Sequence, residues 1–438
     1  MKEINLGLIG LGTVGTGVVK ILQQNEEVIS ARLGFHLKLK RVADLDMEKS
    51  RGLNFEEGVL TREAMDIIND PRIDVVIELI GGIEPARTFI TKSIEKGKHV
   101  VTANKALLAN HGQEIFQLAR EREVDIGFEA SVGGGIPIIR ALREGFAANN
   151  IQSIYGIVNG TANYILTKMS HQGLSFDSAL KEAQTEGYAE ADPTYDIEGI
   201  DSAHKITILA RLGFGYPVKF NEVNTEGISR INKIDIELAQ ELGYCIKLLA
   251  IAKRVDSLLD IRVHPTMISK ENLLATVDGV FNAICVTGDM VGPNIFIGQG
   301  AGAFPTGSAI IGDIMEISRA IFGSSPGRVP LSLPGKSGIT GMRQVGEILS
   351  QYYLRFSALD RPGVLSTISG LLGKYQISIA TVFQKGRAKG PRGDVPIVIL
   401  THRAKEIDMQ SALLEIDMLE VITDKTTLIR MEDEEEEK

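Results

Sequence analysis

A glycine motif near the N-terminus, Gly10-Leu-Gly12-Thr-Val-Gly15, constrains the fold of this chain more than any other feature. It follows a strand-like apolar run at residues 4–9 and opens an amphipathic helical stretch. Glycines at these positions permit a tight turn and let a pyrophosphate approach the backbone at a helix N-terminus, where negative charge is favoured. The spacing alone is weak evidence, but its place between a strand and a helix predicts a dinucleotide-binding turn.

Short apolar runs continue through the first third of the chain and alternate with amphipathic stretches. The runs are residues 4–9, 37–43, 75–80, 99–102 and 124–128. Strands that alternate with helices predict an α/β fold with a doubly wound parallel sheet. From residue 151 the pattern changes to a strand at 151–158 and helices at 163–171 and 176–186, which we interpret as a separate α+β domain.

The last third of the chain has a third pattern. A glycine-rich turn at 298–307 opens a helix, and the segment 322–341 is dense in Gly, Pro and Ser, which indicates a linker. The runs beyond it, at 352–358, 362–375, 377–384, 394–402, 409–416 and 421–430, follow a βαββαβ order. This order is ferredoxin-like. The acidic run 432–438 is expected to be a solvated tail.

The bulk composition excludes several classes of protein. The 438 residues are enough for two or three domains, and the net charge of −9 argues against partners such as nucleic acid or anionic membranes. No apolar run has membrane-spanning length, and the N-terminus shows no signal peptide, so we expect a soluble, unprocessed protein. Two cysteines cannot form a disulfide framework, which favours the reducing cytoplasm.

Asp44, at the end of the second predicted strand, bears on the choice of cofactor. A carboxylate at this place could accept hydrogen bonds from the adenosine ribose and repel the 2′-phosphate of NADP, which favours NAD. Arg41 and Lys49 keep NADP open, and the distance in sequence from Gly15 is longer than usual. A plain surface aspartate in a turn is the alternative interpretation.

Two further motifs lie where ligands of doubly wound sheets bind. Thr102-Ala-Asn104-Lys105 ends a predicted strand, so Lys105 could approach a cofactor or substrate, although a solvated lysine is the simpler interpretation. The turn from Glu129 to Pro137 holds three consecutive glycines, and several of its backbone carbonyls could point into one small space. Hard cations take such oxygen ligands. From spacing alone, a structural turn is the better interpretation than a metal site.

The densest group of ionisable residues lies between Gly187 and Lys205, and it includes Glu190, Asp196 and Asp201. Asp201 and Lys205 are four residues apart and share one face of a predicted helix, which is apolar directly after the lysine. A surface ion pair is the simple alternative, but this pattern favours a buried or cleft-facing lysine. Lysine is a poor base at its ordinary pKa of about 10.4 and a ready acid, so reduction of a carbonyl is the easier direction to explain.

Taken together, these motifs resemble homoserine dehydrogenase in order and spacing from about residue 4 to residue 319, and they include Asn159-Gly-Thr161. The tail resembles an ACT domain, with Asp360-Arg-Pro-Gly363 at its first strand-to-helix turn. The resemblance implies five segments: a Rossmann NAD(P)-binding domain at 1–135, a catalytic and dimerisation domain at 136–320, a linker at 321–350, an ACT regulatory domain at 351–431 and the acidic tail at 432–438.

The resemblance also implies roles for individual residues. Lys205 would be the catalytic acid and base, Asp201 would assist it, and Glu190, with Asp196 of the same acidic group, would bind homoserine. The positions that would contact NAD(P) are Gly12, Thr13, Val14, Lys105, Gly187 and Gly302, beside Gly10, Gly15 and Asp44. A monovalent cation, typically sodium, would bind at Glu129, Val132, Gly134 and Ile136.

The implied activity is NAD(P)-dependent interconversion of L-homoserine and L-aspartate 4-semialdehyde in threonine, methionine and isoleucine biosynthesis, with L-threonine as effector and a homodimer or homotetramer as the assembly. One rival is an aspartate-semialdehyde dehydrogenase, which needs a nucleophilic cysteine. We expect Cys245 in an apolar helix at 242–250 and Cys285 in a strand, away from anything that would activate a thiol. The other rival is an amino-acid sensor with a dead scaffold, against which the set Glu190, Asp201 and Lys205 argues.

Overall fold

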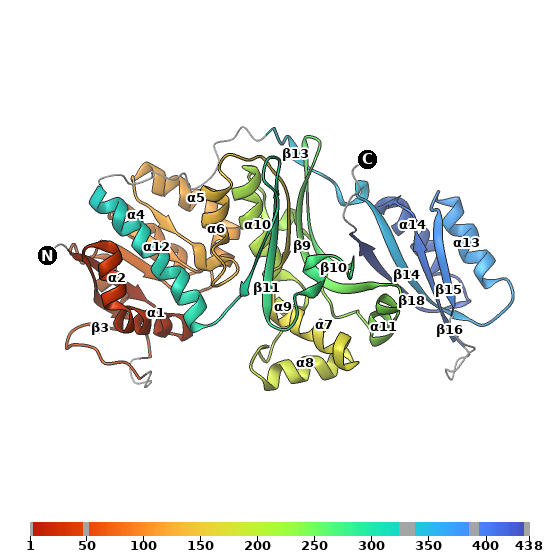
Figure 1. Ribbon diagram of the computed structural model, residues 1–438, viewed down its shortest axis with the longest axis horizontal. Coiled ribbons are helices and arrows are strands. Elements are labelled where there is room, and N and C mark those ends of the chain that lie inside the picture. Colours follow the sequence, from red (N-terminus) through yellow and green to blue (C-terminus); the bar gives the residue numbers. More distant parts are fainter. Residues whose placement is uncertain (1–2, 47–51, 324–337, 385–393, 433–438) are drawn as a thin grey trace. The chain divides into compact units, whose positions relative to one another are not determined.

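The computed structural model describes residues 3–46, 52–323, 338–384 and 394–432 (Figure 1). The backbone divides into two compact units. The first unit comprises Met1–Val158, Asp201–Val223 and Phe281–Ile339, and the second comprises Asn159–Ile200, Asn224–Val280 and Thr340–Lys438. Lys49, residues 324–337 of the expected linker and the tail beyond Glu432 lie outside the described residues.

The first unit contains the expected parallel sheet, with strand order β3-β2-β1-β4-β5-β6. Its strands are β1 (Glu3–Ile9), β2 (His36–Ala43), β3 (Leu60–Thr61), β4 (Val75–Glu78), β5 (His99–Thr102) and β6 (Ile126–Gly127). This is the Rossmann order, and it confirms the doubly wound sheet. The sequence pattern missed only the two-residue strand β3.

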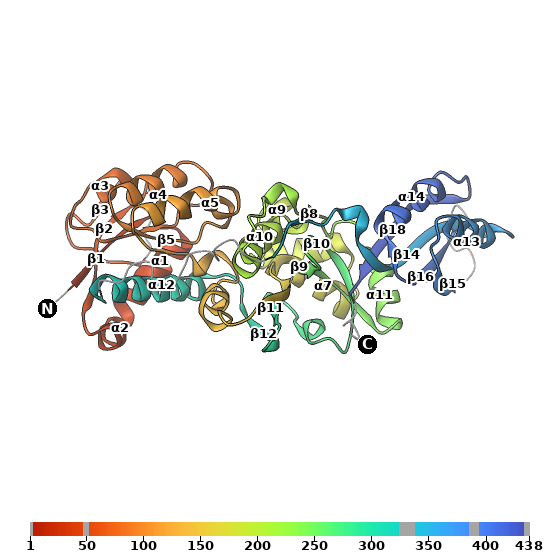
Figure 2. The same ribbon diagram turned by 90° about the horizontal axis from the view of Figure 1, so that it is seen from above.

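Helices cover both faces of this sheet (Figure 2). One face carries α1 (Thr13–Gln24), α2 (Glu26–Leu33) and α12 (Ala303–Gly323), and the other carries α3 (Ala64–Ile68), α4 (Ala86–Glu95) and α5 (Lys105–Glu121). Side chains of β1 alternate between the two layers: Leu6 and Leu8 pack with Val18 and Ile310, whereas Ile9 packs with Ile67. Helices α1 and α12 touch at Gly17, where a Cβ would lie 2.2 Å from the Ala303 carbonyl oxygen.

The remainder of the first unit is built on three antiparallel strands in the order β12-β11-β7. These are β7 (Ile151–Ile157), β11 (Phe281–Gly288) and β12 (Gly292–Gln299), accompanied by α10 (Ile200–Phe214), α6 (Ile138–Arg140) and the short helical turns η1 (Glu129–Ser131), η2 (Ala141–Gly145) and η3 (Phe220–Glu222). Cys285 lies in β11, as expected. Helix α10 is buried over almost its whole length, including its charged residues Asp201 and Lys205.

The second unit joins a helical layer to a long hairpin. Its elements before the C-terminal module are α7 (Gly160–Gln172), α8 (Phe176–Thr185), α9 (Thr194–Ile197), β8 (Asn224–Thr225), α11 (Lys233–Glu241), β9 (Tyr244–Val255), β10 (Leu258–Ser269), η4 (Leu273–Thr276), β13 (Gly341–Met342) and η5 (Val345–Glu347). The expected helix at 242–250 is wrong, because residues 244–250 belong to β9, which pairs antiparallel with β10 along its whole length. A short apolar run without clear periodicity fits either state, and here strand pairing decides.

The C-terminal module has the predicted βαββαβ order. It contains β14 (Leu349–Leu359), α13 (Val364–Lys374), β15 (Ile379–Gln384), β16 (Asp394–Thr401), β17 (Ala404–Lys405), α14 (Glu406–Ile416) and β18 (Ile422–Met431), in sheet order β18-β14-β16-β15. Strand β18 also pairs with β10, so the sheet of the module continues the β9–β10 hairpin. Leu349, which we had placed in the linker, already begins β14.

Glu432 corrects the expected solvated tail. Its side chain is only 11% exposed, and the carboxylate accepts hydrogen bonds from Lys253, at 3.1 Å, and from Arg262. Burial opposes its ionisation, but the charges of Arg262 and Lys253 outweigh burial and hold the pKa of Glu432 below its usual range. The charge pattern concealed this role, because Glu432 opens a run of acidic residues.

Candidate active site

The glycine-rich turn between β1 and α1 has the form that a dinucleotide needs. Gly10 has φ of +99°, which favours glycine, and a Cβ on Gly15 would lie 2.2 Å from the Gly10 carbonyl oxygen. A Cβ on Gly12, by contrast, would meet no atom within 4 Å. The turn is therefore closed on its protein side and open at Gly12, directly before Thr13 and Val14 at the N-terminus of α1. These residues fit a bound pyrophosphate.

Asp44 lies beside this turn, after the end of β2. Its carboxylate accepts hydrogen bonds from the backbone N–H of Leu11, at 2.6 Å, and of Asp46, at 2.9 Å. The contact to Leu11 places the half-buried carboxylate directly against the glycine motif. Asp44 thus has a structural role in holding the turn, which the sequence did not reveal.

A network of polar side chains orients the start of α5. Glu78, at the end of β4, accepts hydrogen bonds from the Thr102 hydroxyl and from the N–H groups of Ile80 and Gly81. The Thr102 oxygen accepts a bond from the N–H of Asn104, which caps α5 by accepting a bond from the Leu107 N–H. Lys105 is the first residue of this capped helix.

Lys105 and Lys205 share the carboxylate of Asp201. The Lys105 ammonium lies 2.7 Å from Oδ1 and the Lys205 ammonium lies 2.6 Å from Oδ2, and Lys205 also donates to the Val158 carbonyl. The side chains of Asp201 and Lys205 are 6% and 9% exposed, whereas that of Lys105 is 42% exposed. The structure thus brings together three predicted residues and adds the Val158 carbonyl, which no sequence signal identified.

The electrostatics of this cluster fix its ionisation. Burial opposes ionisation of Asp201, but the positive charges of Lys205 and Lys105 outweigh it and hold the pKa of the carboxyl well below its usual range. Next to it on α10, His204 is buried against Phe220, with ring centroids 4.3 Å apart. Burial lowers the pKa of His204 to about 4, so its imidazole is neutral at pH 7. The residues able to donate a proton here are therefore the lysines.

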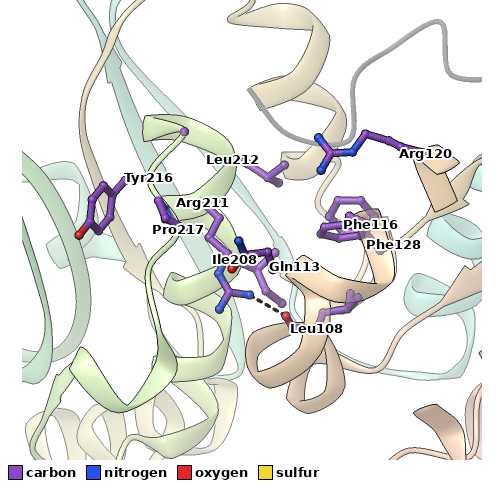
Figure 3. A pocket seen from close by; sticks show the side chains of 11 residues that line it. Leu108, Gln113, Phe116, Arg120, Phe128, Ile208, Arg211, Leu212, Tyr216 and Pro217 are labelled. Carbon is purple, nitrogen blue, oxygen red and sulfur yellow. Dashed lines mark hydrogen bonds between the residues drawn. The ribbon is translucent and has the colours of Figure 1, made fainter. Parts of the chain in front are cut away.

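Arg211 fixes α10 against α5. Its guanidinium donates to the Leu108 carbonyl on α5 at 2.8 Å (Figure 3). It also donates to the carbonyls of Ala109 on α5, at 2.7 Å, and of Val218, at 2.8 Å. Beside it lies an apolar cavity of about 180 Å³ with Phe116, Phe128 and Leu212 in its wall. None of the reactive side chains lines this cavity. The hydrogen bonds of Arg211 thus hold together the two helices that carry Lys105 and Lys205.

The loop expected to bind a cation is mostly buried, and the carboxylate of Glu129 in it accepts hydrogen bonds from the backbone. Both oxygens of Glu129 accept backbone hydrogen bonds, from Ile139 at 2.7 Å and Arg140 at 2.9 Å. Within the described residues, no group of three or more His, Cys, Asp or Glu side chains could hold a metal. The carbonyl oxygens of the buried residues Val132 and Gly134 accept no hydrogen bond from the described part of the chain. Any cation ligands in this loop would therefore be backbone carbonyl oxygens, which are ligands of the kind that hard cations take.

Three of the remaining predicted residues lie in the second unit. Gly187 and Glu190 are in the loop after α8, and Asp196 is in the short helix α9 at the end of that loop. The Thr161 hydroxyl donates to the Tyr188 carbonyl at 2.6 Å, and the Asn159 amide donates to Asp196 at 2.7 Å, so both ends of this loop are tied to the start of α7. Glu190 lies exposed between these anchors, and Gly187, with φ of +77°, opens the loop after α8. Gly302 lies elsewhere, in the first unit, with φ of +125° directly before α12.

Within the described residues, no helix is long and apolar enough to cross a membrane.

A Rossmann sheet with an open glycine turn and a buried lysine–aspartate cluster defines an NAD(P)-dependent oxidoreductase, here carrying a ferredoxin-like C-terminal module. Family models agree: residues 10–129 match the NAD-binding domain of homoserine dehydrogenase, residues 137–315 match homoserine dehydrogenase, and residues 352–420 match the ACT domain. The chain belongs to the homoserine dehydrogenase family, and it is an oxidoreductase that acts on the CH–OH group of homoserine.

Individual relatives support this assignment over the whole chain. The chain is 46% identical to a homoserine dehydrogenase of Neisseria gonorrhoeae over 434 residues, which covers 99% of each protein. It is 43% identical to that of Pseudomonas aeruginosa, also with 99% of each covered. The crystal structure of a homoserine dehydrogenase from Thiobacillus denitrificans matches with a TM-score of 0.93, at 46% identity and with 99% of each chain covered. A hyperthermophilic archaeal homoserine dehydrogenase in complex with NADPH matches 72% of this chain and 98% of its own, with a TM-score of 0.63 and 28% identity.

Proposed function

We propose that the chain interconverts L-homoserine and L-aspartate 4-semialdehyde with Lys205 as the proton donor and acceptor. The observation that carries this proposal is the buried cluster in which one carboxylate, Asp201, holds the ammonium groups of Lys205 and Lys105. A pair of fixed lysines is suited to stabilise and protonate an alkoxide as it forms.

A nicotinamide cofactor held at the glycine-rich turn would supply the hydride for reduction of the aldehyde carbon. Lys205 then delivers a proton from Nζ to the carbonyl oxygen, which becomes the hydroxyl of homoserine. Asp201 stays ionised and keeps Nζ in place, and the Val158 carbonyl fixes it from a second side. In the oxidative direction Lys205 must first lose its proton, which the charge of Asp201 opposes and that of Lys105 assists.

Glu190 and Asp196 are proposed to bind homoserine, whose ammonium group calls for carboxylates. Support comes from the anchored loop in which both lie, because a loop tied at Tyr188 and Asp196 loses less conformational freedom when a ligand binds. For the cofactor, the open turn at Gly12 supports roles for Gly10, Gly12, Thr13, Val14 and Gly15. For Lys105, Gly187 and Gly302, the proposed role in cofactor binding rests on the resemblance to the family.

The rival thioester chemistry has no support in the structure. Cys245 lies half-buried in β9, where burial raises the pKa of its thiol. A nucleophilic thiol needs the opposite shift. We propose a cytoplasmic setting, in threonine, methionine and isoleucine biosynthesis, for this chain with its two cysteines. The proposed assembly is a homodimer or homotetramer.

The carboxylate of Asp44 is expected to make kcat/KM for homoserine oxidation higher with NAD than with NADP, because it lies against the turn where a 2′-phosphate would add negative charge. Asp44→Ser should narrow this difference. Steady-state kinetics with both cofactors check the prediction. A native enzyme that strongly prefers NADP would contradict the role of Asp44, whereas no homoserine-dependent reduction of either cofactor would overturn the proposed activity.

Sodium is the cation we propose for the loop of Glu129, Val132, Gly134 and Ile136, with backbone carbonyls as ligands. Replacing choline chloride with NaCl at constant ionic strength is expected to raise Tm, since a ligand that binds only the folded state adds about 2.7 kcal/mol of stability at 100 times its Kd. Thermal unfolding followed by circular dichroism measures this effect without reference to activity. Equal Tm values in the two salts would exclude a cation site of useful affinity.

A further inference from the structure

Arg430 binds two carboxylates, one inside the C-terminal module and one in the rest of the second unit. It lies on β18 and is 2% exposed. Its guanidinium binds both oxygens of Glu406, at 2.9 and 2.6 Å, and both oxygens of Glu226, at 3.0 and 2.9 Å. Glu406 is the first residue of α14 and also accepts a bond from the Tyr352 hydroxyl at 2.8 Å. A displacement of α14 would therefore be transmitted to Glu226 through the guanidinium of Arg430.

The segment that begins at Glu226 is packed against the residues that follow α9. The N–H of Ile228 donates to the Ile197 carbonyl at 2.7 Å. A Cβ on Gly227 would lie 2.3 Å from the same oxygen, and a Cβ on Gly199 would lie 3.4 Å from the Glu226 carbonyl oxygen. The two segments are thus in direct backbone contact. A displacement of one segment is therefore expected to disturb the other.

The residues after α9 lie next in sequence to the catalytic machinery. Helix α9 ends at Ile197 and contains Asp196, which Asn159 holds. Helix α10 begins at Ile200, and its second residue is Asp201. A shift of Ile197–Gly199 would consequently reach the substrate loop on one side and the start of α10 on the other.

Further charged groups brace this connection. Arg262 on β10 is buried and binds Asp260 and Glu432, and it donates to His264 at 2.9 Å. Separating a buried ion pair leaves an uncompensated charge, which is strongly destabilising. These pairs therefore oppose separation of the module from the hairpin.

We propose that Arg430 and Glu226 are positioning residues, through which the C-terminal module sets the conformation of Ile197–Gly199 and hence of the homoserine-binding loop. This inference rests on the proposed function for the role of that loop. It assigns no contact with substrate to either residue. Their effect on the reaction is indirect, through the backbone contact between Ile228 and Ile197.

Glu226 is the residue to replace, because its side chain is 43% exposed and its loss should not unfold the chain. Glu226→Gln and Glu226→Ala are expected to raise KM for homoserine by about 2- to 30-fold. KM for the cofactor and kcat should change less than twofold. Amides of residues 194–200 should exchange hydrogen faster. Glu226→Asp, which keeps the charge, should recover part of the wild-type KM.

Glu415→Gln is the matched control. Glu415 pairs with Lys374, at 2.7 Å, on the surface of the same module, away from β10. This variant should leave both KM and exchange unchanged. The proposal would be overturned if Glu226→Ala kept the wild-type KM for homoserine and the wild-type hydrogen exchange of residues 194–200. It would also be overturned if Glu415→Gln changed both quantities as much as Glu226→Ala does. If the wild-type protein does not oxidise homoserine, the proposed function fails, whereas the exchange of residues 194–200 still tests the coupling.

Discussion

Replacing Lys205 with alanine is expected to lower kcat by about two to four orders of magnitude, the usual contribution of a general acid or base. Lys205 is the buried ammonium of the cluster, and neutral His204 cannot take over as a proton donor at pH 7. The fold should survive, because Lys105 remains 2.7 Å from Asp201 and continues to compensate its charge.

Steady-state kinetics in both directions, together with circular dichroism of the purified variant, would measure this effect. Lys92→Ala provides a matched control, since Lys92 is an exposed lysine on α4 of the same unit. If Lys205→Ala keeps its fold and more than about a tenth of the wild-type rate, another residue transfers the proton.

L-Threonine is expected to bind the C-terminal module and lower activity by about 5- to 150-fold at saturation, the usual range of coupling between separate sites. The proposed site is the turn at Asp360, which leads into α13 with Gly363 at φ of +92°. Backbone N–H groups there could bind the carboxylate of an amino acid, and Asp360 could bind its ammonium group. Asp360→Ala should weaken the inhibition.

Calorimetric titration and rate measurements on wild type and Asp360→Ala test this prediction. A chain that ends near Gly346 would be a poor control for two reasons. It loses β18, which pairs with β10, and it loses Glu432, which binds Arg262. No heat from the intact protein would leave the module with an assembly role. Equal inhibition of both proteins would place threonine in the homoserine pocket as a competitor.

Much of the site could be predicted from sequence where the residues concerned are close along the chain. The turn from Gly10 to Gly15 and the pair Asp201 and Lys205 belong to single local elements, a strand-turn-helix and one helical face. Asp44 was also recognised, but its bond to the Leu11 N–H was not. Its role in holding the turn depends on the parallel pairing of β1 and β2, which brings the carboxyl ends of both strands together.

By itself the sequence determined the parallel N-terminal sheet and the βαββαβ module, because glycine conformations and apolar periodicity act locally and leave few alternatives. Three features depended on the tertiary structure: residues 244–250 form a strand, Lys105 binds Asp201, and Arg430 binds Glu226. The pair Lys105 and Asp201 is 96 positions apart, and Arg430 and Glu226 are 204 positions apart. Local pattern carries no information about such pairs, since packing between elements sets which buried charges meet, and the need to compensate each buried charge then holds them together.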